Sequence, residues 1–190
     1  DAVNKFDQLT LGELREALGL IAADNGVRGV LITSAKPEYF IVGADIGEFG
    51  ALFRRGEAAL LGNLAEANAI FNALEDLAVP SVCAINGTAL GGGLELCLAA
   101  DGRVMSRSAR IGLPEVNIGL LPGAGGTQKL QRAMGAARAL ESLLLGRTFE
   151  PAEAAERDAG CRDVETSRGA CGIVEQRRLR ETVGGDQLQL

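Results

Sequence analysis

The chain has 190 residues, 47% of them apolar and 23% charged, so it is long enough to bury a substantial core as one domain. Acidic residues outnumber basic ones by 25 to 19, and the resulting net charge of −6 disfavours binding to nucleic acid or to an anionic membrane surface. The sequence contains no histidine, which excludes a Ser-His-Asp triad, a Cys-His dyad and every metal site that depends on histidine.

The first half of the chain alternates predicted helices with short apolar strands. Apolar residues recur at helical spacing over 9–24, so we predict a helix there with Thr10 as its cap. Residues 27–34, VRGVLITS, form a β-branched apolar run that is typical of a buried strand, and residues 40–42 are expected to be strand-like. A single apolar face over 57–77 predicts a long helix.

The second half continues the alternation up to residue 157. We predict buried strands at 81–86 and 102–106, a glycine-rich loop at 87–93, loop and turns at 111–126, and helices at 94–100, 128–145 and 151–157. Buried strands that alternate with helices predict an α/β architecture.

The last segment, 158–190, differs in composition from the rest of the chain. Only 11 of its 33 residues are apolar, against 47% for the whole chain, and their periodicity is poor. We therefore expect a core at 1–157 followed by a loosely ordered, divergent tail at 158–190. Because the sequence begins at Asp1 and no strand precedes Asn4, we also expect the domain to lack its amino-terminal segment.

The cysteines give information about the compartment. Their positions, 83, 97, 161 and 171, contain no CxxC spacing, so a thiol-redox or zinc motif is not predicted. Cys83 and Cys97 lie in apolar runs and are interpreted as small buried hydrophobic residues. With no signal-peptide pattern and no apolar run of roughly 20 residues, we expect a cytoplasmic chain without a membrane span.

Two glycine-rich segments carry the features that point to chemistry. The first, Gly87 to Glu95, follows a buried strand and opens a helix, so its free N–H groups favour an enolate or a phosphate. It lacks both the GxGxxG spacing of dinucleotide sites and a following Gly-Lys-Ser/Thr. A glycine-packed turn without a ligand is the structural alternative.

The second segment places a carboxylate among apolar residues and glycines. Glu115 follows Gly112-Leu113-Pro114, 20 residues after Glu95. Two carboxyls in partly apolar surroundings can have different pKa values and share acid–base work. The residue types alone leave open that Glu95 caps its own helix and Glu115 faces solvent. A third segment, residues 40–46, is either part of the same site or a strand end before an Asp-capped helix.

Taken together, these segments resemble the crotonase family, the enoyl-CoA hydratase/isomerase superfamily, over roughly residues 4–157. The matching motifs are Gly43-Ala44-Asp45-Ile46, Ala89-Leu90-Gly91-Gly92-Gly93-Leu94-Glu95, Leu113-Pro114-Glu115 and Leu121-Pro122-Gly123-Ala124-Gly125-Gly126-Thr127. Within the family, residues 4–7 and 40–49 are most similar to the hydratase part of fatty acid oxidation complex alpha subunits. The resemblance implies a crotonase-like repeated ββα spiral.

The resemblance also implies an enoyl-CoA hydratase of fatty acid β-oxidation. The backbone N–H groups of Ala44 and Gly92 would form an oxyanion hole for the thioester enolate. Glu95 would activate a water for attack at C3, Glu115 would protonate C2, and the Gly123 N–H would help to place that water. Coenzyme A, as part of the substrate, would lie against Ile41, Gly43, Ala44, Asp45 and Ile46. No cofactor and no metal are implied.

Two alternatives to the hydratase remain at this point. A Δ3-Δ2-enoyl-CoA isomerase of the same fold can act through one carboxylate, so the presence of both Glu95 and Glu115 favours hydration. A silent relative could bind only acyl-CoA or a protein partner. The expected partners are an acyl-CoA thioester and further copies of the chain, or a thiolase subunit within a fatty acid oxidation complex.

One departure from the family is Gly160-Cys161-Arg162-Asp163, where the family usually has Gly-Leu-Val-Asp.

Overall fold

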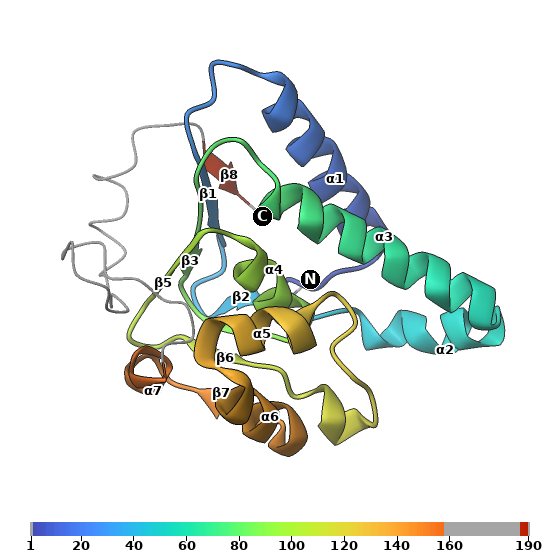
Figure 1. Cartoon of the computed structure of the whole chain (residues 1–190). Helices are drawn as coiled ribbons and strands as arrows, with labels where there is room; N and C mark the ends of the chain where they lie inside the picture. The colour runs from blue at the N-terminus through green and yellow to red at the C-terminus, as the bar shows by residue number, and fades with distance from the viewer. Residues whose placement is uncertain (1, 158–186, 190) are drawn as a thin grey trace.

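Three consecutive pairs of strands build the two sheets of this computed structural model, which describes residues 2–157 and 187–189. In each pair the first strand joins one sheet and the second joins the other, and helical structure follows (Figure 1). The first sheet has the order β5-β3-β1-β8 and all its pairings are parallel. Its strands are β1 (Val30–Thr33), β3 (Ser81–Ile85), β5 (Gly102–Met105) and β8 (Gln187–Gln189).

The second sheet has the order β2-β4-β6-β7, with β7 antiparallel to β6 and the other pairings parallel. Its strands are β2 (Tyr39–Ile41), β4 (Thr88–Leu90), β6 (Arg110–Gly112) and β7 (Thr148–Phe149). The helices are α1 (Gln8–Ala23), α2 (Ile46–Arg54), α3 (Glu57–Glu75), α4 (Gly92–Ala99), the 3₁₀ helix η1 (Glu115–Ile118), α5 (Gly126–Met134), α6 (Ala136–Leu145) and α7 (Pro151–Glu156).

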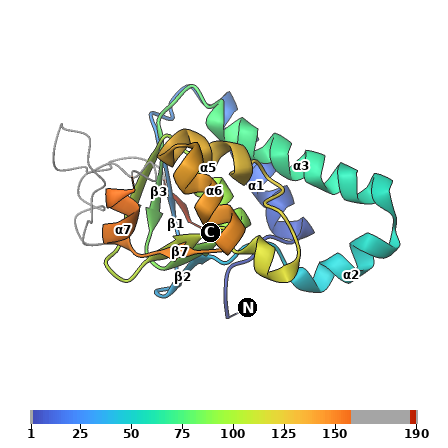
Figure 2. The ribbon, with the colours of Figure 1, turned by 60° about the horizontal axis from the view of Figure 1, so that its bottom comes forward.

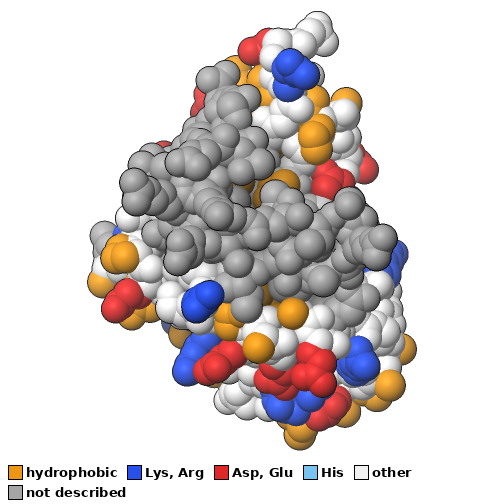
Figure 3. Space-filling view, turned by 90° about the vertical axis from the view of Figure 1, so that its left-hand side faces the viewer, with side chains coloured by type: hydrophobic (Ala, Val, Ile, Leu, Met, Phe, Trp, Pro, Cys, Tyr) orange, Lys and Arg blue, Asp and Glu red, His pale blue; other side chains and the backbone are white. Residues whose placement is uncertain are grey.

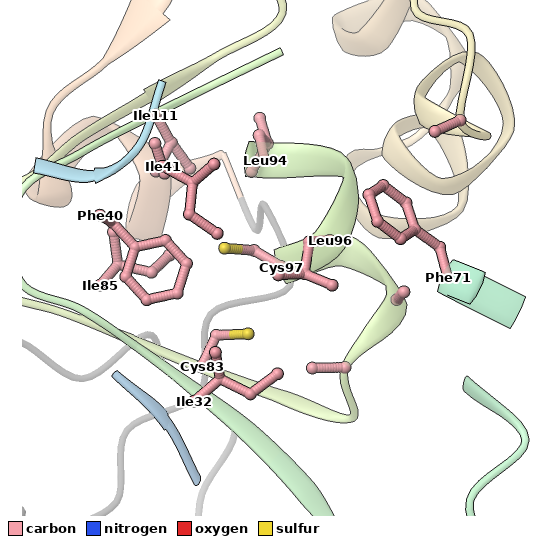
Figure 4. Packing of buried hydrophobic residues seen from close by; sticks show 14 of the residues in the cluster. Ile32, Phe40, Ile41, Phe71, Cys83, Ile85, Leu94, Leu96, Cys97 and Ile111 are labelled. Atoms are coloured by element: carbon pink, nitrogen blue, oxygen red, sulfur yellow. The ribbon is translucent and has the colours of Figure 1, made fainter. Parts of the chain in front are cut away.

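One hydrophobic core joins both sheets and most of the helices. Figure 4 shows side chains from β1, β2, β3 and α4 converging in it, including Ile32, Phe40, Ile85 and Cys97, all nearly inaccessible to solvent. A fully buried side chain of this size contributes roughly 1.5–3 kcal/mol. The two sheets therefore belong to one packed unit, in which α4 packs against strands of both sheets and against α3 and α5.

The α2–α3 connection projects away from this core in both ribbon views (Figures 1 and 2). α2 has no buried residue, and α3 buries only Ile70, Phe71 and Leu74, close to its carboxyl end. Nothing in the first turns of α3 is therefore fixed by core packing. None of the helices in the described ranges is long and apolar enough to cross a bilayer.

Charged side chains tie α7 to α6 on the opposite side. Arg147 pairs with Glu141 and Glu153, and Arg157 pairs with the same two carboxylates. Figure 3 shows acidic and basic side chains next to one another in the lower part of this face. Such partly exposed pairs are each worth little, but a shared network fixes the orientation of a short helix.

The predicted alternation of strands and helices is confirmed, with four corrections. The cap of α1 is Asp7 and not Thr10: the Asp7 side chain accepts the Thr10 N–H, and the Thr10 hydroxyl accepts the Asp7 N–H. The predicted loop at 87–93 contains the strand β4, and the predicted turns at 111–126 contain η1 and the end of β6.

The fourth correction concerns the predicted helix at 128–145. It is two helices, because Gly135, at φ 84°, separates α5 from α6. The expected tail at 158–190 lies outside the described residues, apart from the three residues of β8.

Candidate active site

Glu95 occupies the first turn of α4, with only 3% of its surface exposed. Its Oε1 atom accepts hydrogen bonds from the N–H groups of Ala124 and Gly126, both at 2.8 Å. Burial raises the pKa of Glu95, while these two N–H groups and the positive charge of Lys129 act in the opposite direction. The backbone of the loop before α5 therefore sets the orientation of this carboxyl.

Glu115, the first residue of η1, has a different environment. Its Oε2 atom is buried and has no hydrogen-bond partner among the described residues. Desolvation raises the pKa of Glu115 to about 7; the negative charge of Glu95 adds to the increase and a hydrogen bond from the backbone of Glu115 opposes it. A carboxyl with a pKa near neutrality can both give and take a proton at physiological pH. An unpaired buried oxygen is also a common mark of a functional group.

The start of α4 lies against both Glu115 and the Gly43-Ala44 segment. A Cβ atom on Gly91, which has φ 53°, would lie 3.0 Å from Glu115 Oε1 and 3.7 Å from Gly43 Cα. A Cβ atom on Gly92 would lie 4.0 Å from Ala44 N and 3.3 Å from the ring of Phe6. Three predicted motifs, far apart in the sequence, thus meet where side chains are absent from α4.

The backbone around Ala44 orients its N–H group. Phe6 donates its N–H to Gly43 O and accepts the N–H of Asp45, each at 2.8 Å. Because the C=O and N–H of a trans peptide point in opposite directions, and the Gly43 carbonyl points toward Phe6, the N–H of Ala44 points away from Phe6. The N–H of Gly92, the first residue of α4, has no acceptor inside its own helix. Both are backbone donors at the start of α4, where the Glu115 side chain also lies.

The other predicted site residues have varied surroundings. Ile41 is buried in β2, whereas Ile46 begins α2 and is 62% exposed. Asp45 caps α2 through the Gly47 N–H and forms an ion pair with Lys5 at 2.8 Å. That pairing and the Gly47 N–H hold the pKa of Asp45 below its ordinary value.

Gly123 lies on the loop between η1 and α5, where its carbonyl accepts a hydrogen bond from Asn68 at 2.7 Å. Sequence reasoning did not include Asn68, nor Lys129, which is 7% exposed on α5 and pairs with Glu75 of α3. Lys129 is a charged residue within the buried face of α5, and that interruption is the pattern that could have identified it, whereas Asn68 is only half-buried and gives no such signal. No group of three or more Asp, Glu and Cys side chains able to hold a metal ion occurs within the described ranges.

A helix start lined by glycines, beside two carboxyls that differ in their hydrogen bonding, is the kind of site expected of an acyl-thioester enzyme. Similarity in sequence identifies the family. Residues 1–159 match the profile described as Enoyl-CoA hydratase/isomerase, so the chain belongs to that family. The predicted crotonase resemblance is confirmed.

Among named relatives, the chain is similar to the fatty acid oxidation complex subunit alpha of Pseudomonas putida, at 58% identity over 147 residues, which is 77% of this chain and 20% of the relative. The corresponding subunit of Ectopseudomonas oleovorans is 57% identical over the same lengths. The chain thus spans about a fifth of the length of these relatives.

Solved structures confirm the fold. The enoyl-CoA hydratase of Bacillus anthracis has a TM-score of 0.80 and 34% identity, covering 93% of this chain and 64% of that one. DspI of Pseudomonas aeruginosa has a TM-score of 0.75 and 34% identity, covering 82% and 63%. The predicted α/β crotonase-like class is therefore correct.

Proposed function

We propose that this chain carries the hydratase site of a fatty acid oxidation enzyme, adding water to a 2-trans-enoyl-CoA to give a 3-hydroxyacyl-CoA. Glu95 takes a proton from the bound water while the water oxygen forms a bond to C3. The C2–C3 π electrons move toward the thioester oxygen as an enolate, and Glu115 delivers its proton to C2. The proton on Glu95 then returns to Glu115 through exchange with water, and the atoms of one water are added overall.

The contrast between the two carboxyls is the observation that carries this proposal. Glu95 is held by two backbone donors that favour its charged form, as a base requires. Glu115 has an unpaired buried oxygen and a pKa raised to about 7, as an acid working near neutral pH requires. Two neighbouring carboxyls in unlike environments are suited to divide acid and base roles.

The backbone donors support the same chemistry. The N–H groups of Ala44 and Gly92 are proposed to hold the thioester oxygen as it becomes an enolate, and the Gly123 N–H to help hold the water. In other enzymes one such oxyanion donor is worth roughly 3–4 kcal/mol. The absence of a side chain on Gly92 leaves room for a thioester there. The chemistry needs no cofactor or metal ion, because coenzyme A belongs to the substrate.

The segment from Ile41 to Ile46 is proposed to receive coenzyme A, because it leads from a buried strand to the exposed start of α2 beside Gly92. The similar relatives are named as subunits of a complex. We accordingly propose association with a thiolase subunit or with further copies of this chain.

The test is the loss of crotonyl-CoA absorbance on hydration. Glu95→Gln and Glu115→Gln should each lower kcat by about a hundredfold or more, because the nearly isosteric amide cannot transfer the proton. The double variant should lose little beyond the worse single variant, since both groups act on one water. Glu16→Gln, on the exposed face of α1, is the matched control and should leave kcat unchanged.

Two further measurements separate the alternatives. Conversion of a 3-enoyl-CoA that survives Glu95→Gln, with no hydration by the unaltered chain, would identify an isomerase that depends on Glu115. Calorimetric binding of an acyl-CoA without either reaction would identify a silent relative. Near-normal hydration by either single variant would contradict the division of roles between Glu95 and Glu115.

A further inference from the structure

Lys129 is unusual because it is a lysine inside the fold. It is 7% exposed and lies on the buried face of α5 with Gly126 and Leu130. Lysine is almost never buried unless it is paired, because moving its charge out of water is costly. Its partner is Glu75 at the carboxyl end of α3, which is itself partly exposed. The pair therefore crosses from α5 to α3.

The Lys129 side chain runs along the loop that holds Glu95. A Cβ atom on Gly125 would lie 3.1 Å from Lys129 Cε, so the lysine stem covers that glycine. Gly125 separates Ala124 and Gly126, the two residues whose N–H groups bind Glu95 Oε1. Displacing the lysine would free the backbone that fixes the carboxylate.

A second contact attaches the same loop to α3. The Asn68 Nδ2 atom donates to Gly123 O at 2.7 Å and to Leu64 O of its own helix at 2.8 Å. The loop is consequently held against α3 at both ends, by Asn68 at Gly123 and by Glu75 through Lys129. The Leu64 side chain of α3 also packs over this loop, because a Cβ atom on Gly123 would lie 2.6 Å from Leu64 Cδ2. The two polar contacts therefore add direction to a place where α3 and the loop already pack together.

Besides anchoring the loop, Lys129 acts on Glu95 through its positive charge. The positive charge of Lys129 lowers the pKa of Glu95 against the effect of burial. The charged groups around Glu95 are Glu115 from η1, Lys129 from α5 and, behind Lys129, Glu75 from α3. Glu115 disfavours a charge on Glu95 and Lys129 favours it. Lys129 is thus the one cation facing this carboxyl within the described residues.

We propose that Lys129, anchored by Glu75, is a positioning residue that holds the loop at 122–126 in place and keeps a positive charge on the side of Glu95. The inference rests on the proposed role of Glu95 as the base. Lys129 itself touches no reacting atom, and it acts through the Ala124 and Gly126 N–H groups and through its charge.

Three substitutions separate charge from anchoring. Lys129→Met removes both, Lys129→Gln keeps a hydrogen-bond donor for Glu75 without the charge, and Lys129→Arg keeps both. Arg132→Met is the control, because it removes an exposed cation from the same helix. The titration of the Glu95 carboxyl is followed by ¹³C NMR of the full chain, with the resonance assigned by its loss in Glu95→Gln.

We expect the Glu95 titration to move to higher pH in Lys129→Met and in Lys129→Gln, and to stay unchanged in Lys129→Arg and Arg132→Met. In the hydration assay, kcat/KM of Lys129→Met should fall about tenfold at pH 6 and less than about threefold at pH 8, with the loss in kcat rather than KM. Lys129→Arg should keep kcat/KM close to that of the unaltered chain.

The NMR measurement does not need activity, so it tests this inference even if the chain does not hydrate enoyl-CoA. Lys129→Gln serves the same purpose if Lys129→Met fails to fold. An unchanged Glu95 titration in the charge-removing variants, or an equal loss of activity at every pH, would overturn the proposal and leave Lys129 a purely structural residue.

Discussion

At the scale of single residues, the two carboxyls differ in what the backbone supplies to them. The loop at 122–126 provides Glu95 with two N–H donors, so its desolvation is partly compensated. Glu115 receives burial without an equivalent partner for Oε2. A buried polar atom without a partner costs free energy of folding. The charged form of the buried Glu115 costs more than the neutral form, so the fold loses stability when Glu115 gives up its proton.

This cost predicts that Glu115→Gln stabilises the fold in a pH-dependent way. The pKa of Glu115 rises from 4.5 to about 7 on folding, so folding is favoured while both states are protonated. That contribution is lost as pH rises from about 4.5 through about 7. At pH 8 the variant, which cannot ionise, should be more stable by about 1–2 kcal/mol, after allowing for the partial exposure of the carboxyl.

Urea unfolding at pH 5 and pH 8 measures the difference. The stabilisation should be small at pH 5 and larger at pH 8, and the exposed control Glu16→Gln should show neither effect. A variant that is less stable than the unaltered chain at pH 8 would mean that Glu115 is paired in the folded chain.

The two carboxyls of the candidate site could be predicted from the sequence more easily than the residues that hold them in place. Glu95 and Glu115 follow glycine-rich segments with recognisable spacing, and the fold brings both to the start of α4. Lys129 and Asn68 were missed because their roles depend on α3 meeting the loop at 122–126, about 55 residues away in sequence. Local periodicity describes one helix at a time and contains no information on which helix lies opposite.

At the scale of elements, short strands were the hardest to predict. β4 has three residues inside a glycine-rich segment, and it exists because β2 and β6 pair with it on either side. The long apolar segments at 9–24 and 57–77 needed no such help, because each carries enough periodic residues to define a helix alone. The cap of α1 was misplaced because Asp7 and Thr10 cap each other, and either residue fits the pattern.

The close approach of α4 to β2 gives an element-scale prediction. A Cβ atom on Gly93 would lie 2.0 Å from Ile41 O, and a backbone atom cannot move aside as a flexible side chain can. Gly93→Ala should therefore push α4 away from the sheet and reduce the free energy of unfolding by about 3 kcal/mol. The control Gly62→Ala, at an open position on α3, should raise it by about 0.5–1 kcal/mol.

Denaturant midpoints of the two variants provide the comparison. If Gly93→Ala were as stable as Gly62→Ala, α4 would have to sit farther from β2 than the structure places it.

At the scale of the whole molecule, the two sheets are separate in hydrogen bonding but share one core. Phe40 and Ile41 of the second sheet pack in the same cluster as Ile32 and Ile85 of the first (Figure 4). The sequence indicated buried strands but did not assign them to two sheets, because each strand pair changes sheet within a few residues. α4 packs against strands of both sheets, and this shared packing makes the two sheets one unit.

The shared core predicts that both sheets unfold in a single transition. Tyr39 lies in β2, and as the only tyrosine in a chain without tryptophan it gives a fluorescence signal from the second sheet alone. Circular dichroism at 222 nm reports the helices. The two thermal midpoints should coincide, because losing either sheet exposes the cluster that stabilises the other. Phe40→Ala should lower both midpoints together and cost about 3–5 kcal/mol, since Phe40 is fully buried. A tyrosine transition that precedes the loss of helix would show that the second sheet unfolds on its own and that the core joining them contributes little.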